Sequence, residues 1–253
     1  MIQLKNAQEL AKMRRACQIS AEALKLGGRS IEAGMTTADL DKIIYDYIKR
    51  HGARPNFKGL YGFTGTACIS INDEVIHGLP SHSRQIRPGD IVSIDTGAAI
   101  NGFNGDNACT FPCGKVDIEA QRLMDVTKES LHRGIAAAVA GNRVGDIGHA
   151  VQSYVEENGF SVVRSFVGHG VGKELHEDPE VPNYGHAGHG VRLVNGMTIA
   201  IEPMVNQKHH SVKTLSDGWT VVTADGGLAA HFEHSIAILP GGPEILTIGW
   251  EEP

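Results

Sequence analysis

The chain has 253 residues, of which 41% are hydrophobic and 21% charged, a composition that suits a globular protein with a full buried core. Its formal net charge of −6 provides no long-range attraction to nucleic acid or to an anionic membrane. No apolar run approaches the roughly 20 residues of a membrane span and residues 1–15 lack a signal-peptide core, so we expect a cytoplasmic protein with no membrane or specific nucleic-acid partner.

The predicted elements form two similar series along the chain. Each series contains a long helix, a shorter amphipathic helix closed by glycine, and a buried strand behind a glycine turn. The first series covers residues 10–24, 33–52 and 89–95, and the second covers residues 123–135, 140–159 and 196–202.

The two series predict an internal duplication. The shorter helices and the strands recur at a constant offset of 107 positions, which makes a chance resemblance the weaker alternative. Both strands end on an acid, Asp95 and Glu202. We predict one domain over residues 1–253, made of two fused halves over about 1–113 and 114–253. Helices outside and a curved, mainly antiparallel sheet inside would give an α+β architecture.

The cysteines are too few and too scattered for a disulfide framework. Cys109 and Cys113 have the spacing of half a zinc site, but no second cysteine or histidine pair follows at finger spacing. Buried, reduced thiols are therefore expected at Cys17, Cys68, Cys109 and Cys113.

Four carboxylates and one imidazole lie in predicted strands or tight turns, where such side chains are unusual: Asp95, Asp106, His169, Glu202 and Glu233. A single aspartate at a strand end is more often a cap or a turn residue. Asp95 and Asp106, however, are separated by the length of a hairpin that would bring both acids to one edge. Like charges held together need a cation or a raised pKa.

Glu202 and Glu233 each lie in an apolar strand, where a buried charge requires a partner. A salt bridge is the alternative, but neither flank supplies a lysine or arginine nearby in sequence. His169 is flanked by glycines, which would let the backbone approach a ligand closely. A phosphate-binding loop is disfavoured there, because Val167 and Glu174 stand where that motif needs Gly and Ser or Thr.

These five side chains form a hard, oxygen-rich donor set that suits two divalent cations better than one. Mn, Fe, Co or Zn fit such a set, and soft Cu(I) does not. Two metal ions a few ångströms apart commonly activate water for hydrolysis. The His-Glu-x-x-His motif of single-zinc proteases is absent from the sequence. His77 and His176 lie near the candidate ligands in sequence, although a lone histidine is more often a surface or core residue.

Six segments of the chain, in their order and spacing, resemble the type I methionine aminopeptidases over about residues 3–250. These segments are residues 70–80 (SINDEVIHGLP), 93–95, 105–106, 168–172, 201–203 and 232–234. The resemblance implies the pseudo-symmetric pita-bread fold, in the short form that has no N-terminal zinc-finger extension. It also implies removal of the initiator methionine from new polypeptides, preferably before a small second residue.

The resemblance further implies roles for individual residues. The five candidates would hold two divalent metal ions (Co, Mn or Fe, with Zn and Ni as further choices), and Asp106 and Glu233 would bridge them. Glu202 would also shuttle the proton as general base and then acid. His176 would donate a hydrogen bond to the tetrahedral oxyanion, and His77 would contact the peptide near the scissile nitrogen. The implied partners are nascent polypeptide N-termini, with transient ribosome contact, and the implied state is a monomer.

The family's methionine pocket corresponds to six positions, for each of which ordinary core packing is an equal alternative. These positions are Phe57, Leu60, Phe63, Cys68, Leu175 and Trp219. The chain departs from frequent family choices: Phe57 stands where Cys is frequent, Leu60 and Phe63 where Tyr is frequent, Leu175 where Phe is frequent, and Asn107 where Ser or Thr is usual. These departures concern the shape of the pocket and the tolerated second residue, not the chemistry.

Two other functions compete with this interpretation. An Xaa-Pro aminopeptidase or prolidase relative would share the five ligands, but such enzymes usually carry an extra N-terminal domain for which 253 residues leave no room. A catalytically inactive pita-bread binding protein would typically have lost ligands, whereas this chain keeps all five and both histidines. Both alternatives are weaker than a methionine aminopeptidase.

Overall fold

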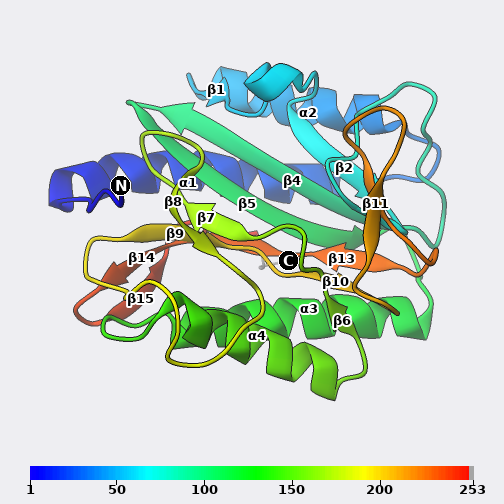
Figure 1. Ribbon diagram of the computed structural model, residues 1–253. Helices are drawn as coiled ribbons and strands as arrows, with labels where there is room; N and C mark the ends of the chain where they lie inside the picture. The colour runs from blue at the N-terminus through cyan, green and yellow to red at the C-terminus, as the bar shows by residue number, and fades with distance from the viewer. Residues whose placement is uncertain (251–253) are drawn as a thin grey trace.

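A computed structural model describes residues 1–250, so the last three residues of the predicted domain 1–253 lie outside the described residues. Its centre is a curved nine-stranded sheet (Figure 1) in which every neighbouring pair of strands is antiparallel. Seven strands follow in the order β1 (Arg54–Pro55), β4 (Ile91–Ile100), β5 (Phe103–Pro112), β14 (Glu233–Leu239), β9 (Thr198–Ile201), β7 (Gly168–Gly170) and β8 (Glu177–Val181). The other two are β2 (Ala67–Ile71), which pairs with β4, and β15 (Gly242–Ile245), which pairs with β14.

Two smaller sheets of three strands complete the β structure. The first has the order β13 (Ala229–His231), β10 (Met204–Asn206) and β6 (Ser161–Val162). The second has the order β11 (Val212–Thr214), β12 (Val221–Thr223) and β3 (Glu74–Ile76). A short 3₁₀ turn, η1 (Leu60–Gly62), precedes β2 in the chain.

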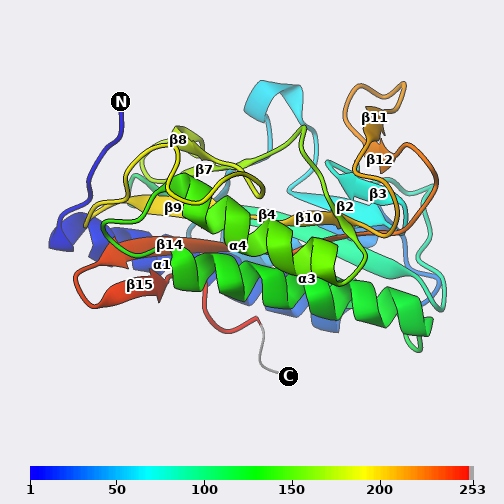
Figure 2. The same ribbon diagram turned by 60° about the horizontal axis from the view of Figure 1, so that its bottom comes forward.

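Residues 1–250 contain four α-helices: α1 (Ala7–Arg29), α2 (Thr37–Arg50), α3 (Ile118–Ala137) and α4 (Val144–Glu157). In Figure 2, α1 and α3 lie along the lower side of the sheet, whereas β8 and β11 rise from the opposite side. A local capping interaction fixes the start of α1. The Asn6 side chain accepts hydrogen bonds from the backbone amides of Gln8 and Glu9. None of the helices within residues 1–250 is both long and apolar enough to cross a bilayer.

The predicted duplication is visible in the element bounds. Helix α4 begins and ends 107 positions after α2, and β9 begins 107 positions after β4. The two predicted halves of the chain meet in the sheet where β5 pairs with β14, with Glu233 opposite Ala108. Helices outside a curved antiparallel sheet confirm the predicted α+β architecture.

One prediction about strand ends was wrong. Asp95 does not end its strand but lies in the middle of β4, which continues to Ile100. The continuation pairs with β1 as well as β5, and Gly97 makes room for this, since a Cβ there would lie 2.2 Å from the Asn56 side-chain oxygen. Glu202 directly follows the last residue of β9, as expected.

The main hydrophobic core contains residues from both predicted halves, from Ile19 in α1 to Trp250. Helix α1 packs very closely on β5, and only glycine at residue 105 allows this. A Cβ at Gly105 would lie 2.5 Å from the Cα of Cys17. This contact fixes the backbone beside Asp106. All four cysteines are buried thiols, as predicted from their small number and scattered positions.

Candidate metal centre

Asp95 and Asp106 face the same side of the sheet from neighbouring strands. In the β4–β5 register, Asp95 lies opposite Ala108 and Asp106 lies opposite Gly97, so the two acids are diagonal neighbours on one face. The hairpin that joins the strands turns at Asn101-Gly102, where both residues have positive φ, as a two-residue turn of this kind requires. The predicted hairpin therefore brings the two acids together.

His169 lies in the middle of β7, between two glycines that have a packing role. A Cβ at Gly168 would lie 2.3 Å from the carbonyl oxygen of Ala200, and one at Gly170 would lie 2.2 Å from that of Asp178. The glycines thus allow neighbouring backbone segments to approach closely, a role that the sequence did not predict. Nδ1 of His169 lies 2.8 Å from the Gly170 carbonyl oxygen, an arrangement that holds the ring and leaves Nε2 to face the acids.

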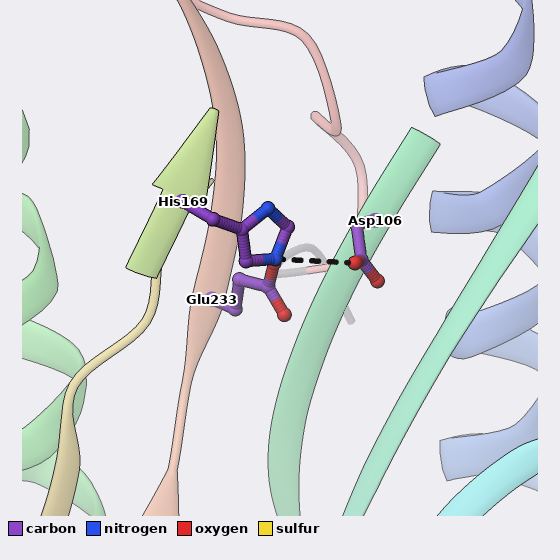
Figure 3. Close-up of side chains that lie close together, drawn as sticks. All are labelled: Asp106, His169 and Glu233. Carbon is purple, nitrogen blue, oxygen red and sulfur yellow. Dashed lines mark ion pairs between the residues drawn. The ribbon is translucent and has the colours of Figure 1, made fainter. Parts of the chain in front are cut away.

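The imidazole and the carboxylates converge from different strands (Figure 3). Asp106, His169 and Glu233 each offer one ligand atom, and these atoms lie within 4.8 Å of one another. Nε2 of His169 is 3.8 Å from Asp106 Oδ2 and 3.5 Å from Glu202 Oε1. Such spacing leaves room for a cation between the donor atoms.

Protein groups do not compensate the charge of these acids. Asp95 Oδ1, Asp106 Oδ1 and Glu233 Oε1 are buried and accept no hydrogen bond. Within residues 1–250, no lysine or arginine forms an ion pair with any of the four carboxylates, so the salt-bridge alternative fails. Buried oxygens without a partner are costly, and a divalent cation would supply what they lack.

Burial also determines the pKa values of the residues in this site. Burial raises the pKa of Asp106 to about 7 and raises the pKa values of Asp95, Glu202 and Glu233 well above their usual range. The neighbouring Asp106 carboxylate adds to the rise in each of the last three. Burial lowers the pKa of His169 to about 4, which leaves a neutral imidazole, the form that binds a metal. The donor set fits divalent metal ions.

All thirteen residues singled out in the sequence line one cavity of about 730 Å³. Beside the acids, an apolar cluster of Phe57, Phe63, Cys68 and Leu175 is joined by Leu60, Leu79 and Trp219. The rings of Phe63 and Trp219 meet edge to face, with centroids 5.1 Å apart. These residues form an apolar recess separate from the main core, and Leu79, which packs against it, was not predicted from the sequence.

His77 and His176 flank the acids. The ring of His176 meets the ring of His169 at an interplanar angle of 80°, with centroids 4.5 Å apart. His77 follows β3 with a φ of 59°, and its ring lies against those of Phe166 and Trp219. A non-glycine residue in this conformation is strained, and such strain concentrates at functional sites. Burial lowers the pKa of His77 to about 4.

Comparison with known proteins agrees with this geometry. The profile of metallopeptidase family M24 matches residues 11–240. The chain belongs to metallopeptidase family M24. A methionine aminopeptidase from Clostridium perfringens is 55% identical over 248 residues, which cover 98% of this chain and 99% of that protein. Methionine aminopeptidase 1 of Bacillus subtilis is 50% identical over 247 residues, with 98% and 99% covered.

A solved structure extends this similarity to three dimensions. The crystal structure of a methionine aminopeptidase from Thermotoga maritima superposes with a TM-score of 0.96 at 45% identity, covering 98% of this chain and 99% of that one. Within family M24, the chain therefore groups with the methionine aminopeptidases. A metallopeptidase must bind metal, and the group of Asp106, His169 and Glu233 is its candidate site.

Two residues that contact Glu202 were not predicted from the sequence. His231 is fully buried, and its Nε2 lies 3.9 Å from Glu202 Oε2. The side-chain amide of Asn183 donates a hydrogen bond of 3.0 Å to the backbone oxygen of Glu202. His231 ends β13 two positions before Glu233 begins β14, and this closeness in sequence to a candidate ligand is the one local signal for His231. No local signal marks Asn183, which lies 19 positions before Glu202.

Proposed function

We propose that this protein removes the initiator methionine from new polypeptides, preferably before a small second residue, by metal-dependent hydrolysis. One observation carries the proposal: the apolar recess lies in the same cavity as the buried acids. Family membership and relatives at 50–55% identity over nearly the whole chain support it.

Two divalent ions are the proposed cofactor, held by Asp95, Asp106, His169, Glu202 and Glu233. Asp106 and Glu233 would each contribute to holding both ions. The hard donor set favours Mn, Fe or Co, with Zn and Ni as further choices. When bound, the metal ions supply an activated water and polarise the scissile carbonyl group.

The protein's own groups would carry the rest of the reaction. Burial raises the pKa of Glu202, which suits a carboxylate that takes a proton from water and returns it to the leaving amine. His176 would donate a hydrogen bond to the oxyanion, and burial keeps it neutral by lowering its pKa. His77, on the other side of the recess, would hydrogen-bond the peptide near the scissile nitrogen.

Selection of methionine would come from the apolar recess. Phe57, Phe63 and Cys68 are nearly fully buried, so an unbranched thioether side chain would fill space that water fills poorly. Trp219 would close one wall by its contact with Phe63. The physiological partners would be nascent polypeptide N-termini in the cytoplasm, met during transient ribosome contact by a monomeric enzyme.

A peptide assay tests the proposal. Purified protein with Mn²⁺ should release methionine from Met-Gly-Met-Met and leave an Xaa-Pro peptide intact, with products identified by mass spectrometry. Met-Leu-Met-Met, with a bulky second residue, serves as the matched substrate control and should be cleaved more slowly. Cleavage of the Xaa-Pro bond would move the protein to the prolidase side. Cleavage of no peptide would favour an inactive binding protein.

A further inference from the structure

The loop that joins β7 to β8 carries two of the proposed functional residues. Leu175 lies in the apolar recess, and His176 follows it directly before β8 begins at Glu177. The loop has little regular structure, and an internal hydrogen bond of 3.0 Å from the Gly172 amide to the Glu174 oxygen tightens its first part. The position of the loop therefore depends on its contacts with other segments of the chain.

A buried ion pair fastens this loop to the start of the chain. Lys5 Nζ pairs with Glu177, and the two side chains are only 3% and 5% exposed. Oε1 of Glu177 in turn accepts a hydrogen bond of 3.2 Å from the Glu174 amide. Through Glu177, Lys5 is thus linked to the residues that precede and follow Leu175 and His176.

Lys5 is itself held in place. Its backbone amide donates a hydrogen bond of 2.7 Å to the Gly196 oxygen, and its ammonium group donates one of 3.0 Å to the Gln3 oxygen. The loop leaves room for its side chain only because residue 172 is glycine. A Cβ there would lie 2.4 Å from Lys5 Cε and 2.6 Å from Glu177 Oε1. The last glycine of the 168–172 segment thus accommodates this ion pair.

We propose that Lys5 is a positioning residue for His176, acting through Glu177 and the loop between β7 and β8; this inference rests on the proposed function. A buried ion pair is a poor source of net stability, because desolvation offsets the attraction, but losing one partner leaves an uncompensated charge. Its geometry is fixed once formed, so it can hold a side chain to the accuracy that an oxyanion donor needs.

The chain provides a matched control on the same loop. Lys173 pairs with Glu9 of α1 at 3.1 Å, but its side chain is 55% exposed, and an exposed pair holds a loop weakly. Lys5→Met keeps the apolar stem and removes the charge, and Lys173→Met does the same at the surface. Lys5→Met should lower kcat for Met-Gly-Met-Met about tenfold with a KM change below about twofold. Lys173→Met should stay within about twofold of the unchanged protein.

A double-mutant cycle separates positioning from general stability. In a His176→Ala background, Lys5→Met should cause no further loss of kcat, because the group that Lys5 positions is gone. An equal loss in both backgrounds would overturn the inference. The ring resonances of His176 in ¹⁵N-histidine-labelled protein give a readout without turnover. They should shift in Lys5→Met and not in Lys173→Met, and unchanged resonances in both would also overturn it.

A second variant covers the case in which Lys5→Met fails to fold. Lys5→Met with Glu177→Met replaces the pair by apolar groups, an exchange that is often neutral for stability. This double variant should fold and keep the reduced kcat, and an unchanged kcat would contradict the inference. The two proposals fail differently. An unchanged protein that releases no methionine refutes the proposed function and this inference with it, whereas normal release by folded Lys5→Met refutes this inference alone.

Discussion

Glu202→Gln should lower kcat for Met-Gly-Met-Met by about a thousandfold or more while leaving the fold intact. Glutamine keeps the size of the side chain but cannot accept a proton, and loss of a general base typically costs 10²–10⁴-fold. Glu202 is also a proposed metal ligand, with Oε1 near His169 and Oε2 near His231. The amide of glutamine binds a metal ion less strongly than a carboxylate, so the substitution should also weaken metal binding. Steady-state kinetics at saturating Mn²⁺ measure the loss, and circular dichroism checks the fold.

A control comes from the same cavity wall. Glu180 on β8 lines the cavity but is exposed and lies outside the proposed ligand set. Glu180→Gln should remain within about twofold of the unchanged protein, because an exposed carboxylate has no partner to lose. Substantial activity in Glu202→Gln would remove Glu202 from the proton-transfer role.

The metal-free protein should become less stable as pH rises from about 4 to about 7. The pKa of Asp106 is raised from its ordinary 3.8 to about 7, so the folded state holds a proton that the unfolded state releases, and stability is lost across that window. This shift corresponds to about 4 kcal/mol, and hence to a fall in Tm on the order of 10 °C for a chain of this length. Bound Mn²⁺ should reverse the trend, since ligands must be deprotonated to bind it.

Thermal unfolding with and without Mn²⁺ at several pH values tests this expectation. Asp106→Asn provides the control, because it removes one of the four carboxylates with a raised pKa and should weaken, without abolishing, the pH dependence of the metal-free Tm. The gain in Tm on adding Mn²⁺ should be larger near pH 7 than near pH 5. A metal-free Tm that rises over this window, or a gain that does not change with pH, would contradict the origin assigned to the raised pKa values.

The features that the sequence predicted correctly depend on short-range patterns. The constant offset of 107 positions locates α2 and α4 as well as β4 and β9, because periodicity and glycine turns are local signals. The hairpin that joins Asp95 to Asp106 follows from Asn101-Gly102 and the alternation of its strands. The end of β4 was misplaced because its extension depends on pairing with β1, which is not local.

The features that the sequence could not predict depend on contacts between distant segments. Lys5 and Glu177 are 172 positions apart, and nothing near either residue marks a buried pair. Asn183 and His231 approach Glu202 only after the strands have packed. The residue roles and the division into halves near residue 113 remain predictions, because the element correspondence does not depend on where that boundary lies.

The most direct measurement is a titration of metal-free protein with Mn²⁺, in which bound ions are counted by calorimetry and methionine release is followed in the same samples. We expect two ions per chain, no release without metal, and release that rises as the sites fill. We also expect binding to collapse when Asp106 and Glu233 are replaced by Asn and Gln. Full activity in protein stripped of metal, or unchanged Mn²⁺ binding by that double variant, would contradict a metal centre built from these buried acids.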